Sequence, residues 1–239
     1  MEFLGDVVRW FGDASHWRGT NGIPHRMFEH VTMSLAATLS AAVVALTLGI
    51  VLGHLNRAGW LIINLSNVGR AIPSFAILVL AAQFFGIGAK PAFCALVALA
   101  IPPMVTNSFV GIREVDAEVG ESARAMGMTG SQVLRRVELP IALPLIMAGV
   151  RTSAVQVVAT ATLAALVAWG GLGRYIVDGL AQRDFVQVFA GAVLVAGVSV
   201  LTELILAGIQ RLVVPTGLRR RDSGKNELFV ATAPAVGAA

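Results

Sequence analysis

The chain has 239 residues, of which 56% are hydrophobic and 13% are charged, and its mean hydropathy is +0.76. Apolar residues make up about half of a soluble domain even when glycine is counted, so this composition excludes a soluble domain and favours a protein that spans the bilayer. The formal net charge is +4, but the basic residues lie mainly beside apolar segments, which favours a role in membrane topology over nucleic-acid binding.

Residues 1–30 mix charged and apolar positions without a continuous apolar run. Because a secretory signal peptide needs such a run, we expect no cleavable signal here. We expect these residues to form an extracytoplasmic N-terminal segment.

Five apolar segments follow, and each is long enough to cross a hydrocarbon layer of about 30 Å as a helix. They are Val31–Leu55, Trp60–Phe85, Pro91–Ile112, Pro140–Ala168 and Val186–Val214. Helices are favoured because backbone polar groups find no water inside lipid. We predict an all-α polytopic membrane protein with about five transmembrane helices, with a transmembrane domain over residues 31–214 and a cytosolic flexible tail over residues 215–239.

Two of these segments contain helix-breaking residues. Arg70 and Pro73 interrupt the second segment, and the pair Pro102–Pro103 interrupts the third. An interior proline removes a helical hydrogen bond and kinks the helix. In membranes such breaks survive where neighbouring helices or water satisfy the freed carbonyl groups. The predicted kinks either border a path through the bundle or are purely architectural.

The distribution of basic residues predicts the orientation of the chain. If five helices alternate, one side receives Arg57, the polar insert over residues 113–139 and the arginines of the tail. The other side receives residues 1–30 and a loop in which acidic residues balance the arginines. Because basic loops remain in the cytoplasm, we expect the N-terminus outside, the C-terminus in the cytoplasm, and the insert on the cytosolic side of a bacterial inner membrane.

The polar insert, residues 113–139, carries helix start and stop signals. Asp116 is a good N-cap for a short helix over Ala117–Met126, and Gly127 stands where a left-handed residue ends a helix. The following residues, Thr129–Gln132, match a capping box, which predicts a second helix that runs to the next membrane segment. We therefore expect a helix, a glycine corner and a second helix.

The first of these short helices has one apolar face, formed by Val119, Ala123 and Met126 at helical spacing. A rigid amphipathic helix at a membrane surface can serve as an interfacial lipid-binding element. It can equally serve as a docking element whose apolar face enters a groove on a soluble partner. Spacing alone leaves both interpretations open.

The insert resembles the EAA signature of ABC-importer permeases, E-A-A-x3-G-x9-I-x-L-P. The residues at the signature positions are Glu121, Ser122, Ala123, Gly127, Val137, Leu139 and Pro140. Serine replaces the first alanine and valine replaces the isoleucine, and both changes leave the shape intact. The resemblance implies a type I ABC importer permease fold in which the first short helix is the coupling helix, Gly127 sets its corner, and Leu139–Pro140 transmit its motion to the next membrane helix.

The resemblance also implies partners. They are a dimer of ATP-binding subunits, a second permease copy or a homologous permease, an extracytoplasmic substrate-binding protein and membrane lipid, with no nucleic acid. The sequence has no G-x-x-x-x-G-K-[ST] phosphate loop, so we expect ATP and Mg²⁺ on the partner subunit. We expect no catalytic residue, cofactor or metal site in this chain, whose four histidines lack metal-ligand spacing.

Between about Ile101 and Gly179 the similarity extends to permeases for osmoprotectants such as glycine betaine, carnitine, choline and proline betaine. The patterns A-R-x-M-G-M-T, V-E-L-P-x-A-L-P and A-G-x-R-T carry it. An aromatic cage usually binds a quaternary ammonium ion, but this chain has 7% aromatic residues and one tyrosine, so no cage is evident in it. The resemblance explains this, because it implies that a separate binding protein captures the solute. The alternatives are a methionine-type or other small-solute ABC permease and, from another class, a passive channel or secondary transporter.

Polar residues inside the third and fourth segments are candidates for the translocation path. They are Thr106, Asn107, Arg151, Thr152, Gln156 and Thr160. Arg151 lies about 16 Å into its segment at 1.5 Å per residue, close to the midplane, where a charge costs at least about 2.5 kcal/mol. It either lines the path or pairs with helix carbonyls or with Glu203 to hold the bundle together. The threonine and glutamine stripe that follows it either lines the path or supplies hydrogen bonds between helices.

Overall fold

The computed structural model describes residues 2–214, and every regular element within that range is a helix. The expected tail over residues 215–239 lies outside the described residues. The elements are α1 (Glu2–Gly12), η1 (Ala14–Trp17), α2 (Ile23–His54), α3 (Gly59–Ala71), α4 (Ser74–Phe85), α5 (Ala89–Arg113), α6 (Ala117–Ala125), α7 (Gly130–Val133), η2 (Leu134–Glu138), α8 (Leu139–Thr160), η3 (Ala161–Val167), α9 (Gly173–Gln182) and α10 (Phe185–Val213). The predicted all-α class is confirmed.

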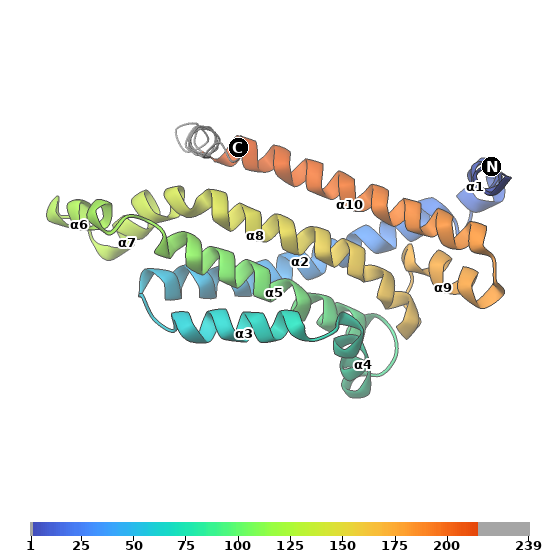
Figure 1. Ribbon diagram of the computed structural model, residues 1–239, viewed down its shortest axis with the longest axis horizontal. Coiled ribbons are helices and arrows are strands. Elements are labelled where there is room, and N and C mark those ends of the chain that lie inside the picture. Colours follow the sequence, from blue (N-terminus) through green and yellow to red (C-terminus); the bar gives the residue numbers. More distant parts are fainter. Residues whose placement is uncertain (1, 215–239) are drawn as a thin grey trace, which may run out of the picture.

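The long helices α2, α3, α5, α8 and α10 run along the long axis of the molecule (Figure 1). The short helices α6 and α7 protrude at one end, which we call the α6 end, and α1 and α9 lie at the other, the α1 end. The two ends therefore separate the polar insert from the N-terminal residues, as the alternation of five segments predicts.

Within residues 2–214, four helical stretches are long and apolar enough to cross a membrane, or five if the bent pair α3 and α4 is one span. This agrees with the predicted number of about five. The four are α2, α5, the stretch 130–167 and α10. The span that contains α2 begins at Ile23, and the span that contains α8 begins at Gly130. Both begin several residues earlier than the sequence predicts. The membrane part thus reaches into both polar segments that flank it.

The two predicted interruptions have different outcomes. At Pro73, which lies directly before α4, the second segment breaks and α3 and α4 meet at 90°. At Pro102–Pro103 the helix does not end, because α5 runs from Ala89 to Arg113 with both prolines inside it, and the predicted kink there stays a prediction. Both of these prolines are buried, and Ser153 of α8 donates a hydrogen bond of 2.9 Å to the backbone oxygen of Ala100. Packing in the centre of the bundle holds the helix across its missing donors.

Helix α5 lies at the centre of the bundle, and its main contacts are with α2 and α8. The contact with α2 is close because small residues face it. A Cβ atom on Gly49 would lie 1.9 Å from Ser108 Oγ, and one on Gly53 would lie 3.0 Å from Ile112 Cβ. The G-x-x-x-G spacing of α2 therefore serves packing within this chain, where small residues let two backbones approach.

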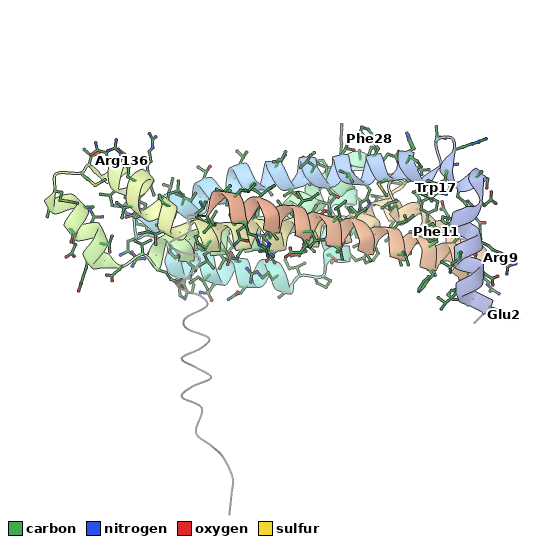
Figure 2. All side chains as sticks on the ribbon, turned by 90° about the horizontal axis from the view of Figure 1, so that it is seen from above. Glu2, Arg9, Phe11, Trp17, Phe28 and Arg136 are labelled. Atoms are coloured by element: carbon green, nitrogen blue, oxygen red, sulfur yellow. The ribbon has the colours of Figure 1, made fainter. Side chains whose placement is uncertain are left out.

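The N-terminal residues form a helix, α1, that the sequence analysis missed. Figure 2 shows α1 lying across the end of the bundle, at a steep angle to the long helices. Val7 and Trp10 are buried, and the ring of Phe3 meets that of Phe189 on α10 edge to face at 5.5 Å. The N-terminal residues are thus packed onto the transmembrane part.

Candidate functional site

The polar insert between α5 and α8 protrudes from the α6 end of the bundle (Figure 1). Asp116 caps α6, because its side chain accepts a hydrogen bond of 2.9 Å from the N–H of Glu118. The helix ends in a Schellman motif, in which the N–H of Met128 donates to the oxygen of Ala123 at 3.2 Å and the N–H of Gly127 donates to that of Arg124 at 2.9 Å. Gly127 has a φ of +84°. The predicted N-cap and glycine corner are both confirmed.

The second half of the insert differs from the prediction. The capping box forms, with the N–H of Thr129 donating to Gln132 Oε1 at 2.8 Å, but the helix it starts does not stop at Pro140. It continues through the π-helical turn η2 into α8, and the stretch 130–167 is one candidate span. Pro140 and Pro144 lack the donors of an α-helix, and a π turn is a usual way to absorb such a defect. The insert is therefore joined to the membrane part by an unbroken helical stretch.

The outward surface of α6 has exposed apolar side chains. Val119 is 42% exposed and Met126 is 78% exposed, whereas Ala123 is buried. A hollow of about 370 Å³ opens beside them. Its lining residues are Asp116, Glu118, Val119, Ser122, Ala123, Met126, Met128 and Val137. The EAA-signature residues Ser122, Ala123 and Val137 thus come together around one hollow.

The remaining signature residues are not among those that line this hollow. Glu121 is exposed on α6, and Leu139 and Pro140 are half-buried at the start of α8. The charge on Glu121 therefore faces outward, while Leu139 and Pro140, the last two residues of the signature, form part of the helix that enters the bundle.

A hydrogen-bonded pair that spacing could not predict ties the insert to α2. His54 Nδ1 lies 2.5 Å from Glu138 Oε2, and the two side chains are 17% and 11% exposed. His54 ends α2, and Glu138 ends η2. A Cβ atom on Gly130 would lie 3.6 Å from His54 Nε2. This contact fixes the base of the insert against the first membrane helix.

A second group of charged residues lies between α8 and α10. Arg151 forms an ion pair with Glu203, and its other terminal nitrogen donates a hydrogen bond of 2.6 Å to Gln210 Oε1. The side chains of Arg151 and Glu203 are 28% and 41% exposed. The pairing that the sequence offered as one alternative for Arg151 therefore exists.

The pair lies at a hollow of about 500 Å³ whose lining residues are Ala148, Arg151, Thr152, Val155, Gln156 and Glu203. Three of the six predicted path residues are thus brought together here. The other three are not. Thr160 lines a separate, much smaller cavity between α4, α5 and α8. Asn107 donates to the oxygen of Pro103 at 2.8 Å, and Thr106 Oγ1 is buried without a hydrogen-bond partner among the described residues.

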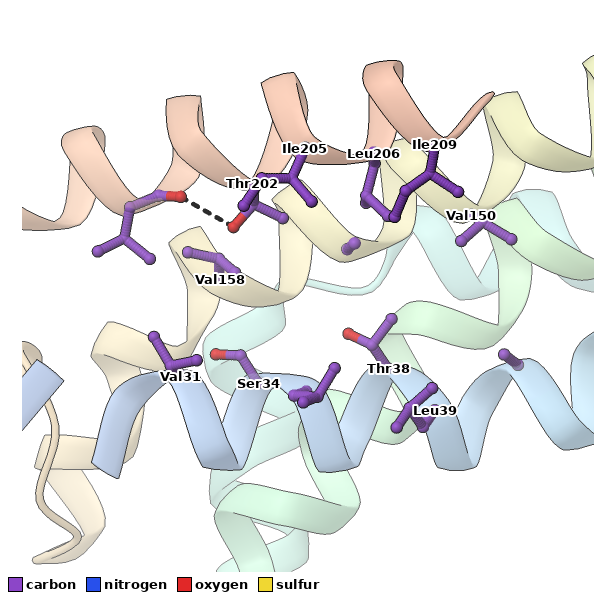
Figure 3. A pocket seen from close by; sticks show the side chains of 14 residues that line it. Val31, Ser34, Thr38, Leu39, Val150, Val158, Thr202, Ile205, Leu206 and Ile209 are labelled. Atoms are coloured by element: carbon purple, nitrogen blue, oxygen red, sulfur yellow. Dashed lines mark hydrogen bonds between the residues drawn. The ribbon is translucent and has the colours of Figure 1, made fainter. Parts of the chain in front are cut away.

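A different hollow, an apolar groove of about 310 Å³, separates α2 from α8 and α10. In Figure 3 the groove lies between Ser34, Thr38 and Leu39 of α2 and Ile205, Leu206 and Ile209 of α10. Thr202 Oγ1 bonds to the oxygen of Val198, and no charged side chain is among the described lining residues. None of the six predicted path residues lines this groove.

The α1 end holds a hydrogen-bonded cluster around a glycine-rich turn, the sequence G-G-L-G at residues 170–173. Glu29 accepts from the N–H of Gly171 at 2.8 Å and from Arg26 at 2.9 Å, and Gly171 has a φ of +80°, as a tight turn requires. Tyr175 donates to the oxygen of Asn21 at 2.6 Å. Burial raises the pKa of Tyr175, against the opposing positive charge of Arg26. The cluster joins the start of α2 to the α8–α9 connection.

Within residues 2–214, no three His, Cys, Asp or Glu side chains form a group that could hold a metal ion. The two outstanding features of the described part are a surface with exposed apolar side chains at the α6 end and a charged hollow between α8 and α10.

Comparisons with known proteins agree with this arrangement. Residues 2–216 match the model of the family described as binding-protein-dependent transport system inner membrane component. The chain is 37% identical to the choline transport system permease protein OpuBB of Bacillus subtilis, over 84% of this chain and 94% of that one. It is 36% identical to the carnitine transport permease protein OpuCB of Listeria monocytogenes, over 91% and 98%, and 36% identical to the glycine betaine/carnitine/choline permease OpuCB of B. subtilis, over 84% and 93%. Among solved structures, the MetNI methionine ABC transporter in an inward-facing conformation superposes with a TM-score of 0.69 at 24% identity, over 79% of this chain and 94% of that one, which supports the fold.

Proposed function

This chain belongs to the family of binding-protein-dependent transport system inner membrane components, and we propose that it is the membrane subunit through which an ATP-driven importer translocates osmoprotectants. The observation that carries the proposal is the rigid insert, with apolar side chains exposed beyond the bundle and an unbroken helical connection to α8. The chain itself is a transport subunit. We place ATP hydrolysis on a partner subunit, with ATP and Mg²⁺ bound there.

The coupling step follows from the geometry of the insert. An ATP-binding subunit would receive the exposed side chains of Val119 and Met126, with Glu121 at the edge of the contact. The corner at Gly127 fixes the angle between α6 and the helical stretch 130–167. Because packed helices move as rigid bodies, closure of an ATPase dimer would displace α6 and tilt this stretch.

The path would run along the charged hollow. At 1.5 Å per residue Arg151 lies about 31 Å from the start of the stretch at Gly130. An ionisable residue at membrane depth almost always faces the bundle interior or a water-filled cavity. The hollow is open on one side of this chain, so we propose that a second permease, identical or homologous, completes it. Thr152 and Gln156 would supply hydrogen bonds to the solute, and Thr106, Asn107 and Thr160 would stabilise the helices around them.

The remaining partners and the orientation follow the same scheme. We place the α6 end in the cytoplasm, where an ATP-binding subunit dimer docks, and the α1 end outside, where a substrate-binding protein delivers the solute. The basic residues near the α6 end, such as Arg135 and Arg136, agree with this orientation under the positive-inside rule.

The three relatives reported above are named for choline, carnitine and glycine betaine. We therefore propose quaternary ammonium osmoprotectants as the substrate class. The methionine transporter supports the fold alone at its level of identity.

The test is uptake of radiolabelled glycine betaine into cells that express this permease with its ATP-binding subunit and binding protein. Unlabelled choline, carnitine and methionine compete in parallel, and an ATPase-inactive partner is the control. We expect ATP-dependent uptake that quaternary ammonium compounds block and methionine does not. ATP-dependent uptake of methionine without uptake of betaine would overturn the substrate class, and uptake without ATP would overturn the importer itself.

A further inference from the structure

The ion pair between Arg151 and Glu203 faces an open hollow at membrane depth. Arg151 lies about the middle of the stretch 130–167, and Glu203 lies about 15 Å from the cytosolic end of α10 at 1.5 Å per residue. More than a quarter of each side chain is exposed in the single chain. Because ionisable residues at membrane depth face the bundle interior or a water-filled cavity, the exposed side of the pair faces the path that the proposed second permease would enclose. On that side the two charges are available to a third group.

The hollow presents two opposite charges and has no aromatic surface. Among its described lining residues, Arg151 and Glu203 are the charged ones, and none is aromatic. A quaternary ammonium ion cannot donate a hydrogen bond, so without an aromatic face it is attracted through charge alone. In this hollow that attraction can come from Glu203. A carboxylate, in contrast, can accept two hydrogen bonds from a guanidinium group.

Arg151 has an unused donor for such a group. One terminal nitrogen serves Glu203 and the other serves Gln210, while Nε is buried and has no partner among the described residues. A solute carboxylate that took the place of Glu203 would therefore meet a guanidinium group already oriented by Gln210. Glu203 would be released at the same moment to face the other end of the solute.

We propose that Arg151 and Glu203 form a paired subsite that selects zwitterions, with the solute carboxylate bound by Arg151 and its quaternary ammonium group beside Glu203. The inference rests on the proposed function of this chain as an osmoprotectant permease. Exchange of the internal pair for two pairs with the solute leaves no isolated charge in the membrane. A solute such as choline has the cation without the carboxylate, so it leaves Arg151 without a negative partner whenever it engages Glu203. Glu203 thus becomes a specificity-determining residue.

The experiment measures uptake of glycine betaine and of choline by the complete system, with one binding protein throughout. Because that protein is constant, a change in the betaine-to-choline ratio belongs to the permease. Glu203→Gln leaves an unpaired positive charge, so we expect the ratio to rise about tenfold, equivalent to about 1.4 kcal/mol. Arg151→Gln leaves an unpaired negative charge, so we expect the ratio to fall by a similar factor.

The control is Asp178→Asn, which breaks the ion pair of Arg174 and Asp178 on α9, away from the hollow, and should leave the ratio unchanged. The neutral double variant Arg151→Gln/Glu203→Gln keeps hydrogen-bonding groups and leaves no lone charge. It removes the partner of the solute carboxylate and the partner of the ammonium group together, so selection for zwitterions should disappear and the betaine-to-choline ratio should fall from its wild-type value towards one. This variant gives the decisive result if a single variant fails to assemble with the ATP-binding subunit. An unchanged ratio in these variants would overturn the subsite and leave the proposed function standing. Failure of the wild type to take up either solute with ATP would instead overturn the proposed function.

Discussion

Replacement of Gly127 by valine tests the corner of the insert on which coupling depends. The backbone of Gly127 has a φ of +84°, and a Cβ atom built there would meet nothing within 4 Å. Crowding therefore contributes nothing, and the whole cost comes from the left-handed backbone. That cost is roughly 1–2 kcal/mol for a residue with a Cβ atom, and glycine does not have it.

The corner can respond to valine in two ways. If it keeps its shape, the variant carries this backbone strain. If it opens, it loses the two Schellman hydrogen bonds at Met128 and Gly127, each of which contributes about 0.5–1.5 kcal/mol. Both routes cost about the same, so the population of the docking-competent insert falls by up to roughly 5–30-fold.

The assays are binding of the ATP-binding subunit to purified permease and ATP-driven uptake in cells. The apparent affinity of the permease for the ATP-binding subunit falls with the fraction of molecules whose insert can dock. Gly127→Val should therefore weaken subunit binding by up to roughly 5–30-fold and reduce uptake, while membrane insertion continues. Asparagine tolerates a left-handed backbone, so Gly127→Asn should stay close to the wild type. Gly197→Val on α10 is the matched control, since its Cβ also meets nothing within 4 Å and no positive φ is involved. Normal binding and uptake by Gly127→Val would refute the role assigned to the corner.

Three further predictions concern the supports of the two ends. Glu138→Gln removes the charge that pairs with His54 at 2.5 Å, so we expect a loss of about 1.5–3 kcal/mol in stability, measured by thermal unfolding in detergent, with a double-mutant cycle to isolate the pair. Tyr175→Phe removes the hydrogen bond to Asn21 and should cost about 1 kcal/mol. Burial raises the pKa of Tyr175 in the folded state. The stabilisation that the neutral phenol gives the folded protein is therefore complete at pH values below the pKa of the unfolded state, and it is lost as the pH rises through the pKa of the folded state. The phenylalanine variant should therefore lose less stability at alkaline pH than the wild type. Gly173→Ala would place a Cβ atom 2.1 Å from a backbone oxygen of η3, so we expect it to abolish folded protein, and recovery of a normally stable variant would contradict the close packing of α9.

The parts of the fold that the sequence predicted correctly depend on local chemistry. An N-cap, a capping box and a Schellman glycine each involve residues within six positions of one another, so Asp116, Thr129 and Gly127 could be read without knowledge of the rest. The break at Pro73 was predictable for the same reason. The prolines of α5 do not end their helix, and local sequence could not show this because the effect of an interior proline depends on its neighbours. They lie in the centre of the bundle, where packing against α2 and α8 holds the helix together.

The errors at the ends of segments also have a physical cause. A hydropathy window detects lipid-like composition, but a helix continues as long as its backbone hydrogen bonds are satisfied. Helix α2 therefore begins at Ile23, within residues that carry charge, and the span that contains α8 begins at Gly130 inside the polar insert. Helix α1 could have been predicted, because its apolar residues recur at helical intervals, but they do not form the continuous run that identifies a signal peptide or a membrane span.

The contacts that matter most for the site join residues that are far apart in sequence. His54 and Glu138 are 84 residues apart, and Arg151 and Glu203 are 52 apart. Sequence spacing placed Arg151 near the midplane, but only the packing of α10 on α8 selects Glu203 as its partner.

That packing also shows how the insert could act on the hollow. The stretch 130–167 carries the second half of the insert and Arg151 on one helical rod, whereas Glu203 belongs to α10, which meets the rod side by side and connects to it through α9. If α6 is the coupling helix, as we propose, a force applied there reaches Arg151 along one continuous helical stretch and reaches Glu203 through the α8–α10 contact or through α9. Relative motion of α8 and α10 would then stretch or release the ion pair. A solute that replaces both partners of the pair would lower the cost of that motion, which would join the proposed specificity and the proposed coupling at the same two residues.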